Sequence, residues 1–384
     1  MSRSSAARQR ERSEWVERAE AVAPRLSECA DASRELRNLA PAAVAALEEA
    51  GIFRMDAPRE VGGFDLHPGT QVELLELLSA ADLSGGWISM IHSIASGAVG
   101  AHLPDPRAIE DIFGAGYPRV AGTANPEGRT RLLSDGNYQL DGRWSFASGI
   151  LHSQWVVCST LLVEADAPPR PLTCIVEQER LVVEDSWYTI GLEGSGSCHF
   201  RAEGLVIQPQ YTMSTDRQVS RGGGWFNAPG LAFLSTGHTG VALGAGKRAL
   251  ELLNSDLSSR TRFGADAAIA DRPAFQRDYG EMSCAYEAAR AYALTMYDDV
   301  MAMLESGQRM SPADDARIRA MSTWVTDVCA EIVRFAHYTA GGSAIFHDHP
   351  LLHLQNDITA ARQHFYVANN VYERSGHARL AKRD

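Results

Sequence analysis

The stretch RWSFASGILHSQW, residues 143–155, alternates aromatic and polar side chains and then runs into the small pair Ser148-Gly149. Alternation with a period of two is typical of a half-buried strand, because successive side chains of a strand point to opposite faces. A glycine directly after such a run marks either a tight turn or a place where something comes close to the backbone. A turn is the commoner outcome for these residues, and a flat, partly polar ligand is the alternative.

The same strand-like pattern continues on both sides of this stretch, from about residue 118 to 212. Short β-rich segments such as WVVCSTLLV and LTCIV alternate with turn signals. The turn signals are SDGN (134–137), LDGR (140–143) and DAPPRP (166–171). We therefore expect an antiparallel β domain in the middle of the chain.

Helical patterns flank this β segment, because apolar positions recur at steps of three and four over residues 8–116 and again from about residue 230. Small residues at helical spacing near the start of the second block would let another helix approach closely. These residues are Gly237, Gly240, Gly244 and Gly246. The run SRGGGWF, 220–226, is expected to be a mobile connection. The order helices, sheet, helices predicts an α+β protein and argues against a doubly wound sheet.

Composition excludes several classes of function. The 384 residues carry a net charge of −12 without a basic run interleaved with aromatic residues, which argues against nucleic-acid binding. No stretch approaches the ~20 apolar residues of a membrane span, and the first residues do not resemble a secretory signal. The six cysteines are scattered singly, so we expect core thiols, no metal site and a cytoplasmic location.

Familiar catalytic motifs are absent from the sequence, which has no GxSxG, HExxH or P-loop pattern. GLEGSGS (191–197) precedes a strand rather than a helix, so we interpret it as β turns. HDHPLLH (347–353) is a weak metal tract and a polar loop is the better interpretation. His364 falls at the border of an apolar helical stripe from Ile358 to Tyr372, where either a packed histidine or one facing a cavity fits the spacing.

Seven motifs taken together resemble a known family over essentially the whole chain. They are AADLSGGW, AGTANPEG, GRWSFASG, GLEGSGS, RTRFG, TAGGSAIFHDHPLLHLQND and ARQHFYV. They are similar to those of the flavin-dependent monooxygenases built on the acyl-CoA dehydrogenase fold. This group contains the oxygenase components of two-component hydroxyphenylacetate hydroxylases, dibenzothiophene monooxygenase and sugar nitrososynthases.

The resemblance implies a fold and an assembly. An N-terminal helical domain (1–117), a β-barrel (118–212), a linker (213–229) and a C-terminal four-helix bundle (230–384) would assemble into a homotetramer, with the flavin between barrel and bundle. Ser148 matches the serine near flavin N5. The other implied flavin contacts are Thr123, Ala124, Asn125, Trp144, Phe146, Arg260, Phe263, Gln276, Gly341 and Gly342. Arg260, Phe263 and Gln276 would act from a neighbouring subunit.

Within this fold the resemblance favours oxygenation over dehydrogenation. A dehydrogenase needs a carboxylate to remove a proton beside a thioester, and both places where the family carries it lack an acid here. His364 instead matches a histidine of the monooxygenases, which would deprotonate a phenol or hydrogen-bond the peroxide. His92, His238 and Trp144 are candidate substrate contacts. In the implied reaction, reduced FMN or FAD from a separate reductase reacts with O₂ to form a flavin C4a-hydroperoxide. The hydroperoxide then hydroxylates a small aromatic or heteroaromatic substrate.

Some alternatives stay open at this point. An acyl-CoA dehydrogenase or flavin-dependent desaturase with an unplaced base is the rival within the fold, and a non-catalytic binding protein is the rival outside it. The sequence leaves open FMN or FAD, the substrate, and oxygenation at carbon, nitrogen or sulfur. Asn356-Asp357 stands where the family often has Arg-Asp, so the contacts of that arginine are in doubt.

Overall fold

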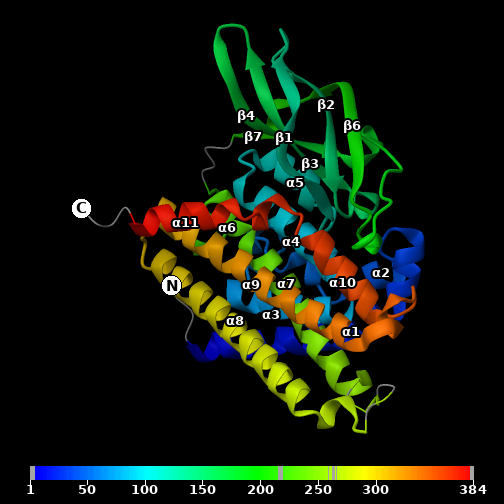
Figure 1. The fold of residues 1–384 in the computed structure, drawn as a ribbon. Coiled ribbons are helices and arrows are strands. Elements are labelled where there is room, and N and C mark those ends of the chain that lie inside the picture. Colours follow the sequence, from blue (N-terminus) through cyan, green and yellow to red (C-terminus); the bar gives the residue numbers. More distant parts are fainter. Residues whose placement is uncertain (1–4, 215–218, 258, 262–263, 265, 381–384) are drawn as a thin grey trace.

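The computed structural model describes residues 5–214, 219–257, 259–261, 264 and 266–380. The chain passes through helices, then strands, then helices again, as the α+β prediction requires (Figure 1). The helices before the strands are α1 (Ser5–Leu36), α2 (Pro41–Glu49), α3 (Pro68–Ala81), α4 (Leu83–His102) and α5 (Pro106–Phe113). The strands are β1 (Val120–Leu132), β2 (Tyr138–Ala147), β3 (Trp155–Glu164), β4 (Ala167–Glu177), β5 (Val182–Val183), β6 (Cys198–Ile207) and β7 (Thr212–Ser214). The later helices are α6 (Gly230–Phe233), α7 (Ser235–Leu252), α8 (Pro273–Glu305), α9 (Pro312–Ala340), α10 (Pro350–Ala361) and α11 (Asn370–Leu380).

The helices from both ends of the chain share one hydrophobic core. A single cluster of buried side chains runs from Trp15 in α1 to Ala361 in α10. Helix α7 lies against α3 so closely that a Cβ added to Gly240 would be 2.5 Å from the Cβ of Leu75. The expectation that small residues let a second helix approach α7 is therefore confirmed.

The strands form one seven-stranded sheet with the order β5-β6-β2-β1-β3-β4-β7. Two features differ from the antiparallel barrel that we expected. Strand β1 runs parallel to β3, from Val120 beside Trp155 to Thr130 beside Leu162, so the sheet is mixed. Within the described residues, the edge strands β5 and β7 make no pair with each other, so the sheet is open. These strands, of two and three residues, are too short to close a barrel.

Helices α4 and α5 join the sheet to the helical layer (Figure 1). Another cluster of buried side chains contains Val99 of α4, Leu103 just after it, Ile112 of α5, Val120 of β1 and Ile175 of β4. Because α4 also contributes to the large helical core, it is packed on both sides. This explains why the second half of α4 is almost entirely apolar.

The segment that leads from the sheet to α7 is held in place, which corrects the expected mobile connection. Residues 215–218 of the expected linker lie outside the described part of the chain. Beyond them, the backbone N–H of Gly223 donates to a carboxylate oxygen of Asp65 (3.1 Å), and Arg221 donates to the carbonyl of Leu103 (2.8 Å). Trp225 is buried in the helical core. Side chains of the N-terminal block thus fix a glycine run that looks mobile in sequence.

Most cysteines lie in the protein core, and the histidine tract forms the start of a helix. Five cysteines are buried as expected, whereas Cys284 on α8 is exposed. In HDHPLLH, Pro350 begins α10 and His349 caps it. Across the described residues no three His, Cys, Asp or Glu side chains are grouped to hold a metal ion, and no helix is long and apolar enough to span a bilayer.

Candidate functional site

Two breaks in the strand ladders open the sheet beside Ser148. The β1–β3 register shifts between Thr123 and Gly128, and the β2–β6 register shifts between Trp144 and Ala147. The two breaks adjoin, because the backbone N–H of Ser145 donates to a carboxylate oxygen of Glu127 (2.8 Å). Residues 124–127 are exposed and lie outside the β1–β3 ladder. Two predicted flavin contacts, Ala124 and Asn125, thus stand where backbone groups are open to a ligand. The third, Thr123, is still paired with Cys158 in the ladder, and its carbonyl accepts the hydroxyl of Ser159 (2.7 Å).

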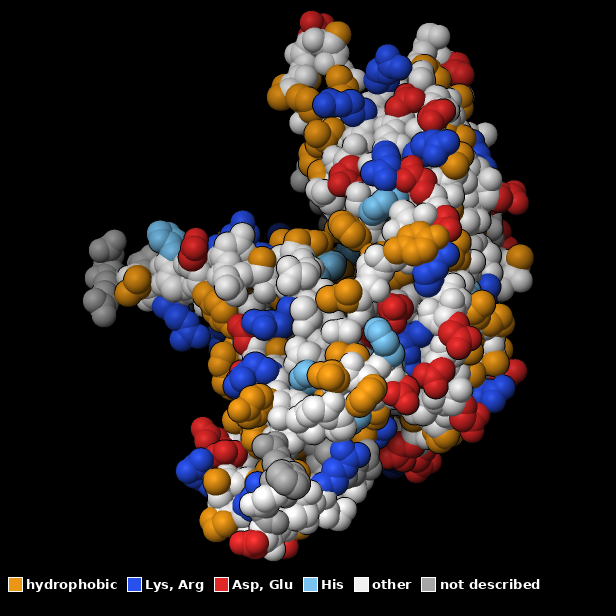
Figure 2. Space-filling view, turned by 45° about the vertical axis from the view of Figure 1, so that its right-hand side comes forward, with side chains coloured by type: hydrophobic (Ala, Val, Ile, Leu, Met, Phe, Trp, Pro, Cys, Tyr) orange, Lys and Arg blue, Asp and Glu red, His pale blue; other side chains and the backbone are white. Residues whose placement is uncertain are grey.

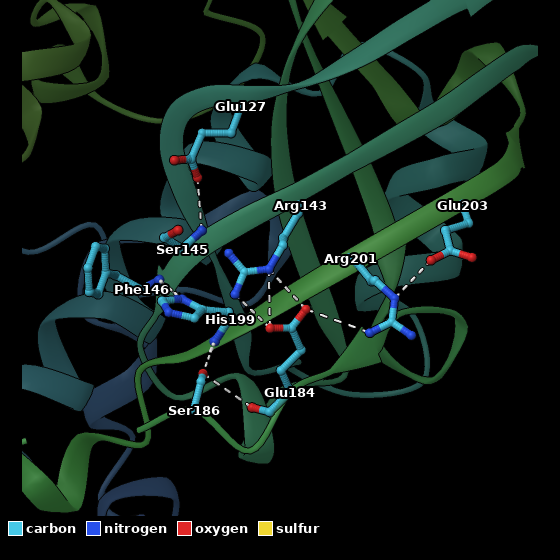
Figure 3. Close-up of polar contacts among 9 residues, drawn as sticks. All are labelled: Glu127, Arg143, Ser145, Phe146, Glu184, Ser186, His199, Arg201 and Glu203. Atoms are coloured by element: carbon cyan, nitrogen blue, oxygen red, sulfur yellow. Dashed lines mark hydrogen bonds and ion pairs between the residues drawn. The ribbon is translucent and has the colours of Figure 1, made fainter. Parts of the chain in front are cut away.

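Phe146 has an unusual conformation at this opening. Its φ is 65° and its ring is 65% exposed, although left-handed backbone is uncommon for a residue with a bulky side chain. Its backbone N–H donates to Nδ1 of His199 (3.4 Å), and the two rings lie 5.4 Å apart (Figure 3). Backbone strain combined with an exposed aromatic ring is typical of ligand sites.

A row of charged side chains supports the outer side of this opening (Figure 3). Arg143 of β2 donates to Glu184 (2.7 Å), and Arg201 of β6 lies 3.6 Å from the same carboxylate. The hydrogen bond from Arg143 lowers the pKa of Glu184. The backbone N–H of His199 donates to Ser186 Oγ (2.8 Å). This bond fixes β6 at the residue whose ring accepts the N–H of Phe146.

Ser148 lies at the inner end of the opening, where it is 5% exposed. The indole Nε1–H of Trp87, on α4, donates to Ser148 Oγ (3.0 Å). Ser148 Oγ is also 2.6 Å from Ser197 Oγ, which is 2.7 Å from Ser195 Oγ. The next residue, Gly149, has φ 72°, and a Cβ there would be 2.8 Å from His92 Nε2. A glycine is therefore required between Ser148 and α4.

His364 and His238 also lie beside the Trp87 indole. The Trp87 ring is 5.7 Å from the His364 ring and 5.3 Å from the His238 ring, with an edge-to-face orientation in both pairs. The two imidazoles are 4.4 Å apart, and His238 stacks on Tyr366 at 4.9 Å. Ser148 and His364 thus contact the same indole. The space-filling view shows histidine side chains among hydrophobic ones where the sheet meets the helices (Figure 2).

His364 does not lie in a continuous helix as the apolar stripe suggested. Helix α10 ends at Ala361, and His364 caps a short 3₁₀ turn, Phe365–Val367. Its Nδ1 accepts the backbone N–H of Tyr366 (3.3 Å), so the neutral ring carries its proton on Nε2. Burial lowers the pKa of His364 to about 4, so the ring is neutral at pH 7. This tautomer presents a hydrogen-bond donor.

The other two candidate histidines differ in their surroundings. Burial and then the neighbouring His364 lower the pKa of His238 well below its ordinary value. His92 Nδ1 is 3.0 Å from the carbonyl of Val120, so this nitrogen carries the proton, while the buried Nε2 has no partner. Burial lowers the pKa of His92 to about 3. His238 lies beside His364, whereas the ring of His92 lies next to Gly149.

Trp144 occupies a different place from the one we expected. Its side chain is fully buried, stacks on Phe200 at 5.0 Å and donates its indole N–H to the carbonyl of Ser159 (2.7 Å). It fills the core of the sheet because Gly128 and Gly142 leave room for its ring. With no exposed atom and a satisfied N–H, Trp144 cannot line a flavin or substrate site in this conformation.

The residues expected at the far end of the flavin lie beyond α7 and at the end of α9. Arg260 donates to Ser343 Oγ (3.0 Å), in the turn that contains Gly341 and Gly342. Gln276 donates to the carbonyl of Ala270 (2.9 Å). Phe263 lies outside the described residues. Arg260 and the glycine turn are therefore neighbours within one subunit, and three exposed apolar side chains lie nearby: Tyr338, Ile345 and Phe346.

The structure adds three residues that the sequence analysis did not single out for the site. Trp87, Ser195 and Ser197 stand in the quoted motifs AADLSGGW and GLEGSGS, but a tryptophan in an apolar helix and serines in a turn give no local signal of a role. Asp357, from the departure noted in sequence, accepts the backbone N–H of Leu192 (2.6 Å). It therefore fastens GLEGSGS to α10, and its burial raises its pKa to about 7.

The fold defines the class of protein. Residues 236–369 match the family described as "Acyl-CoA dehydrogenase, C-terminal domain". Among solved structures, XiaF from a Streptomyces species in complex with FADH2 and glycerol superposes with a TM-score of 0.90, covers 98% of this chain and 97% of that chain, and is 21% identical. The chain therefore has an acyl-CoA dehydrogenase-like fold with a mixed sheet and helices.

The sequence relatives are flavin-dependent monooxygenases, which are oxidoreductases. The chain is 27% identical to an indole-3-acetate monooxygenase from Pseudomonas putida over 341 residues, which are 88% of this chain and 87% of that protein. It is 26% identical over 376 residues to the FADH(2)-dependent resorcinol hydroxylase, oxygenase component, from a Rhizobium species, with 91% and 89% covered. The resemblance stated from the motifs is confirmed.

Proposed function

We propose that this chain is the oxygenase component of a two-component, reduced-flavin-dependent monooxygenase that hydroxylates a small aromatic or heteroaromatic molecule. The observation that carries the proposal is that Ser148, from the end of β2, and His364, from the segment after α10, meet at the Trp87 indole. A separate flavin reductase supplies reduced FMN or FAD, and O₂ is the second substrate. The names of the relatives support this function.

The residues beside Ser148 fit a flat ring system with polar edges. The break in β1 leaves backbone groups at residues 124–127 outside the β1–β3 ladder, Phe146 offers an exposed ring, and buried His92 Nε2 lacks a partner. When bound there, a reduced flavin would supply the reaction with O₂. Ser148 would hold N5, Thr123 to Asn125 would face the ring, and the sheet and helices would exclude water.

The tautomer of His364 supports one of its two expected roles. Its Nδ1 is occupied by the Tyr366 N–H, so Nε2–H is the group available to a ligand. The Nε2–H of a neutral imidazole donates a hydrogen bond, and a proton could be taken up only at Nδ1, which the Tyr366 N–H already occupies. We therefore assign His364 to donating a hydrogen bond to the oxygen being transferred, or to the substrate hydroxyl. His238 and Trp87 would wall the substrate ring.

The finer architecture belongs to the same proposal. The C-terminal helices act as the four-helix bundle, the limits 1–117, 118–212, 213–229 and 230–384 are the functional units, and the enzyme works in the cytoplasm as a homotetramer. Arg260, Phe263, Gln276 and the Gly341-Gly342 turn then reach the far end of a flavin in a neighbouring subunit. The hydrogen bond between Arg260 and Ser343 supports their acting together.

Stopped-flow mixing of the protein and reduced flavin with O₂ tests this function. We expect a long-lived near-ultraviolet absorbance of an oxygenated flavin, which free flavin does not show. Ser148→Ala should shorten its lifetime and raise H₂O₂ release, because N5 loses its partner. His364→Ala should spare the lifetime and slow oxygen transfer. The result against the proposal is flavin oxidation at the free-solution rate with wild-type protein, or tight binding of oxidised FAD together with oxidation of an acyl thioester.

A further inference from the structure

Arg319 of α9 is a buried cation without a counter-ion. The residue is 4% exposed, and its Nε has no hydrogen-bond partner. In the part of the chain that the structure describes, no carboxylate forms an ion pair with it, and its guanidinium carbon lies 5.4 Å from the centre of the Tyr366 ring. Arg290 of α8, by contrast, pairs with Glu73 and Glu76, both at 2.8 Å. An arginine does not lose its proton when it is buried, so the charge of Arg319 remains and is costly without a partner.

Asp315, one turn earlier on α9, does not supply the missing charge. Its Oδ1 is buried and has no partner either. Burial raises the pKa of Asp315, and the attraction of Arg319 offsets this only in part. A carboxylate in a close ion pair shows the opposite balance, since the pKa of Glu73 is lowered in spite of its burial because it binds Arg12 and Arg290.

Hydroxyl groups near Arg319 also lack partners. The side-chain oxygens of Tyr366, Ser235 and Ser322 are buried and make no hydrogen bond within the described residues. Ser322 stands three residues after Arg319, on the same face of α9. Burial raises the pKa of Tyr366, and the nearby hydroxyl of Ser235 acts in the opposite direction. A water molecule satisfies such hydroxyls, but only an anion also balances the guanidinium.

This cluster adjoins the proposed substrate site. The Tyr366 ring stacks on His238 at 4.9 Å, and the His238 ring lies 4.4 Å from that of His364. Ser235 precedes His238 by one turn of α7, so their side chains point to the same face. Three successive side-chain contacts therefore link His364 to the guanidinium of Arg319.

We propose that Arg319 binds a carboxylate of the substrate, so that the enzyme acts on an aromatic acid rather than on a neutral aromatic molecule. The proposal rests on the proposed function, since it takes the ligand to be the substrate. The planar guanidinium matches the two oxygens of a carboxylate, and the hydroxyls of Tyr366 and Ser235 donate to its other lone pairs. The aromatic ring then lies towards Trp87 and His364.

These groups are enclosed in this conformation, so a ligand reaches Arg319 only when side chains shift. Changes of side-chain rotamer are common on binding. Tyr366 is the side chain between His238 and Arg319, and its hydroxyl makes no hydrogen bond that a shift would break.

The first experiment needs no ligand. Arg319→Met replaces the guanidinium with an apolar side chain of similar length. We expect its urea unfolding midpoint to equal or exceed that of wild type, because the variant buries no unpaired charge and loses only the weaker contact with Tyr366. Arg290→Met is the matched control and should lower the midpoint, since Glu73 and Glu76 lose their partner. A lowered midpoint in Arg319→Met would show that the protein itself supplies the counter-charge, which overturns the proposal.

The second experiment measures the thermal unfolding midpoint of the full-length protein with matched acids and amides. The pairs are acetate and acetamide, phenylacetate and phenylacetamide, and indole-3-acetate and indole-3-acetamide, at one pH and one ionic strength set with sodium chloride. A ligand that binds only the folded state raises the midpoint. The acids should bind wild type about tenfold or more tightly than their amides, because they bond to a charged donor. Arg319→Met should lose this preference, and Arg319→Lys should keep part of it, because an ammonium keeps the charge but not the planar fork.

The outcomes separate this inference from the proposed function. A preference for acids that Arg319→Met abolishes supports the proposal. Wild type that prefers none of the three acids to its amide, or a preference that survives in Arg319→Met, overturns the proposal and leaves the function standing, because the stopped-flow test requires no acidic substrate. Oxidation of reduced flavin at the free-solution rate refutes the function, and the substrate assignment falls with it even where the acids bind at Arg319.

Discussion

At the scale of single residues, the sequence singled out Ser148 and His364, the two ends of the proposed site, but not Trp87, which lies between them. Ser148 and His364 stood out because a small pair ended a strand pattern and a histidine bordered an apolar stripe. Trp87 joins them, yet it stands in a helix that is buried nearly throughout. Trp144 was misplaced for the converse reason, because only the packing of Gly128 and Gly142 shows that its ring points into the sheet. Side-chain direction across a ladder break does not follow from alternation alone.

The substitution His364→Asn tests whether His364 acts as a hydrogen-bond donor or as a general base. In His364→Asn, the side-chain oxygen can still cap the N–H of Tyr366 and the amide N–H₂ can still donate, whereas no proton can be removed. We expect His364→Asn to keep product formation within about tenfold of wild type. His364→Ala should lose considerably more. Product formed per reduced flavin oxidised is the measurement.

Equal losses in the two variants would contradict the donor role and restore the general base. The lifetime of the oxygenated flavin serves as the control, since both variants retain Ser148 and should leave it unchanged.

The burial of Asp56 leads to a prediction about how the free energy of unfolding depends on pH. Its side chain is 1% exposed, neither carboxylate oxygen has a partner, and burial raises its pKa to about 8. The folded state therefore keeps the proton, while the unfolded state releases it near the ordinary pKa of 3.8. The contribution to stability is present at low pH and is lost as the pH rises towards 8, at roughly 1.4 kcal/mol per pH unit.

Asp56→Asn removes this titration. We expect the free energy of unfolding of the variant to depend less on pH than that of wild type. The free energy of unfolding of the variant minus that of wild type should increase from pH 5 to pH 7. Urea unfolding at three pH values measures it. Parallel curves for the two proteins would show that Asp56 is ionised in the folded state.

At the scale of elements, apolar residues with a period of two predicted the strands, and those at steps of three and four predicted the helices. Only the structure shows how these elements pair. The parallel pair β1–β3 could not be read from alternation, because the period of two is the same in parallel and antiparallel strands. The helix expected from Ile358 to Tyr372 breaks after Ala361, where His364 caps a new turn. An apolar stripe continues across such a break, so the spacing alone did not reveal it.

The contact between α10 and GLEGSGS can be tested through Asp357. In Asp357→Ala the buried N–H of Leu192 loses its acceptor, which should cost about 1–3 kcal/mol of stability and loosen the loop that carries Ser195 and Ser197. Asp357→Asn keeps an acceptor oxygen and serves as the matched control. Thermal unfolding and flavin titration are the measurements. Unchanged flavin affinity in Asp357→Ala would mean that the loop is held by its packing alone.

At the scale of the whole molecule, the α+β order and the family followed from sequence, whereas the shared core did not. The two helical blocks are separated by the entire sheet in sequence, and nothing in either block shows that α3 packs against α7. The open sheet was also unforeseen, because the shortness of β5 and β7 depends on where pairing stops.

The expected assembly is measurable directly. The resemblance implies four subunits, and the exposed Tyr338, Ile345 and Phe346 beside Arg260 are side chains that an interface or a ligand would cover. Light scattering coupled to size exclusion should give four times the chain mass of 41.7 kDa. Phe346→Asp should lower that mass or weaken flavin binding, whereas Leu132→Asp at the exposed end of β1 should do neither. A monomer that binds flavin with full affinity would exclude sites shared between subunits.

The shared helical core also governs how the protein matures during synthesis. Helices α3 and α4 leave the ribosome well before α7, which they must contact. The nascent chain therefore exposes a large apolar surface throughout translation of the sheet. We expect fragments ending before residue 230 to aggregate rather than fold. The full chain should depend on chaperones when its synthesis is fast.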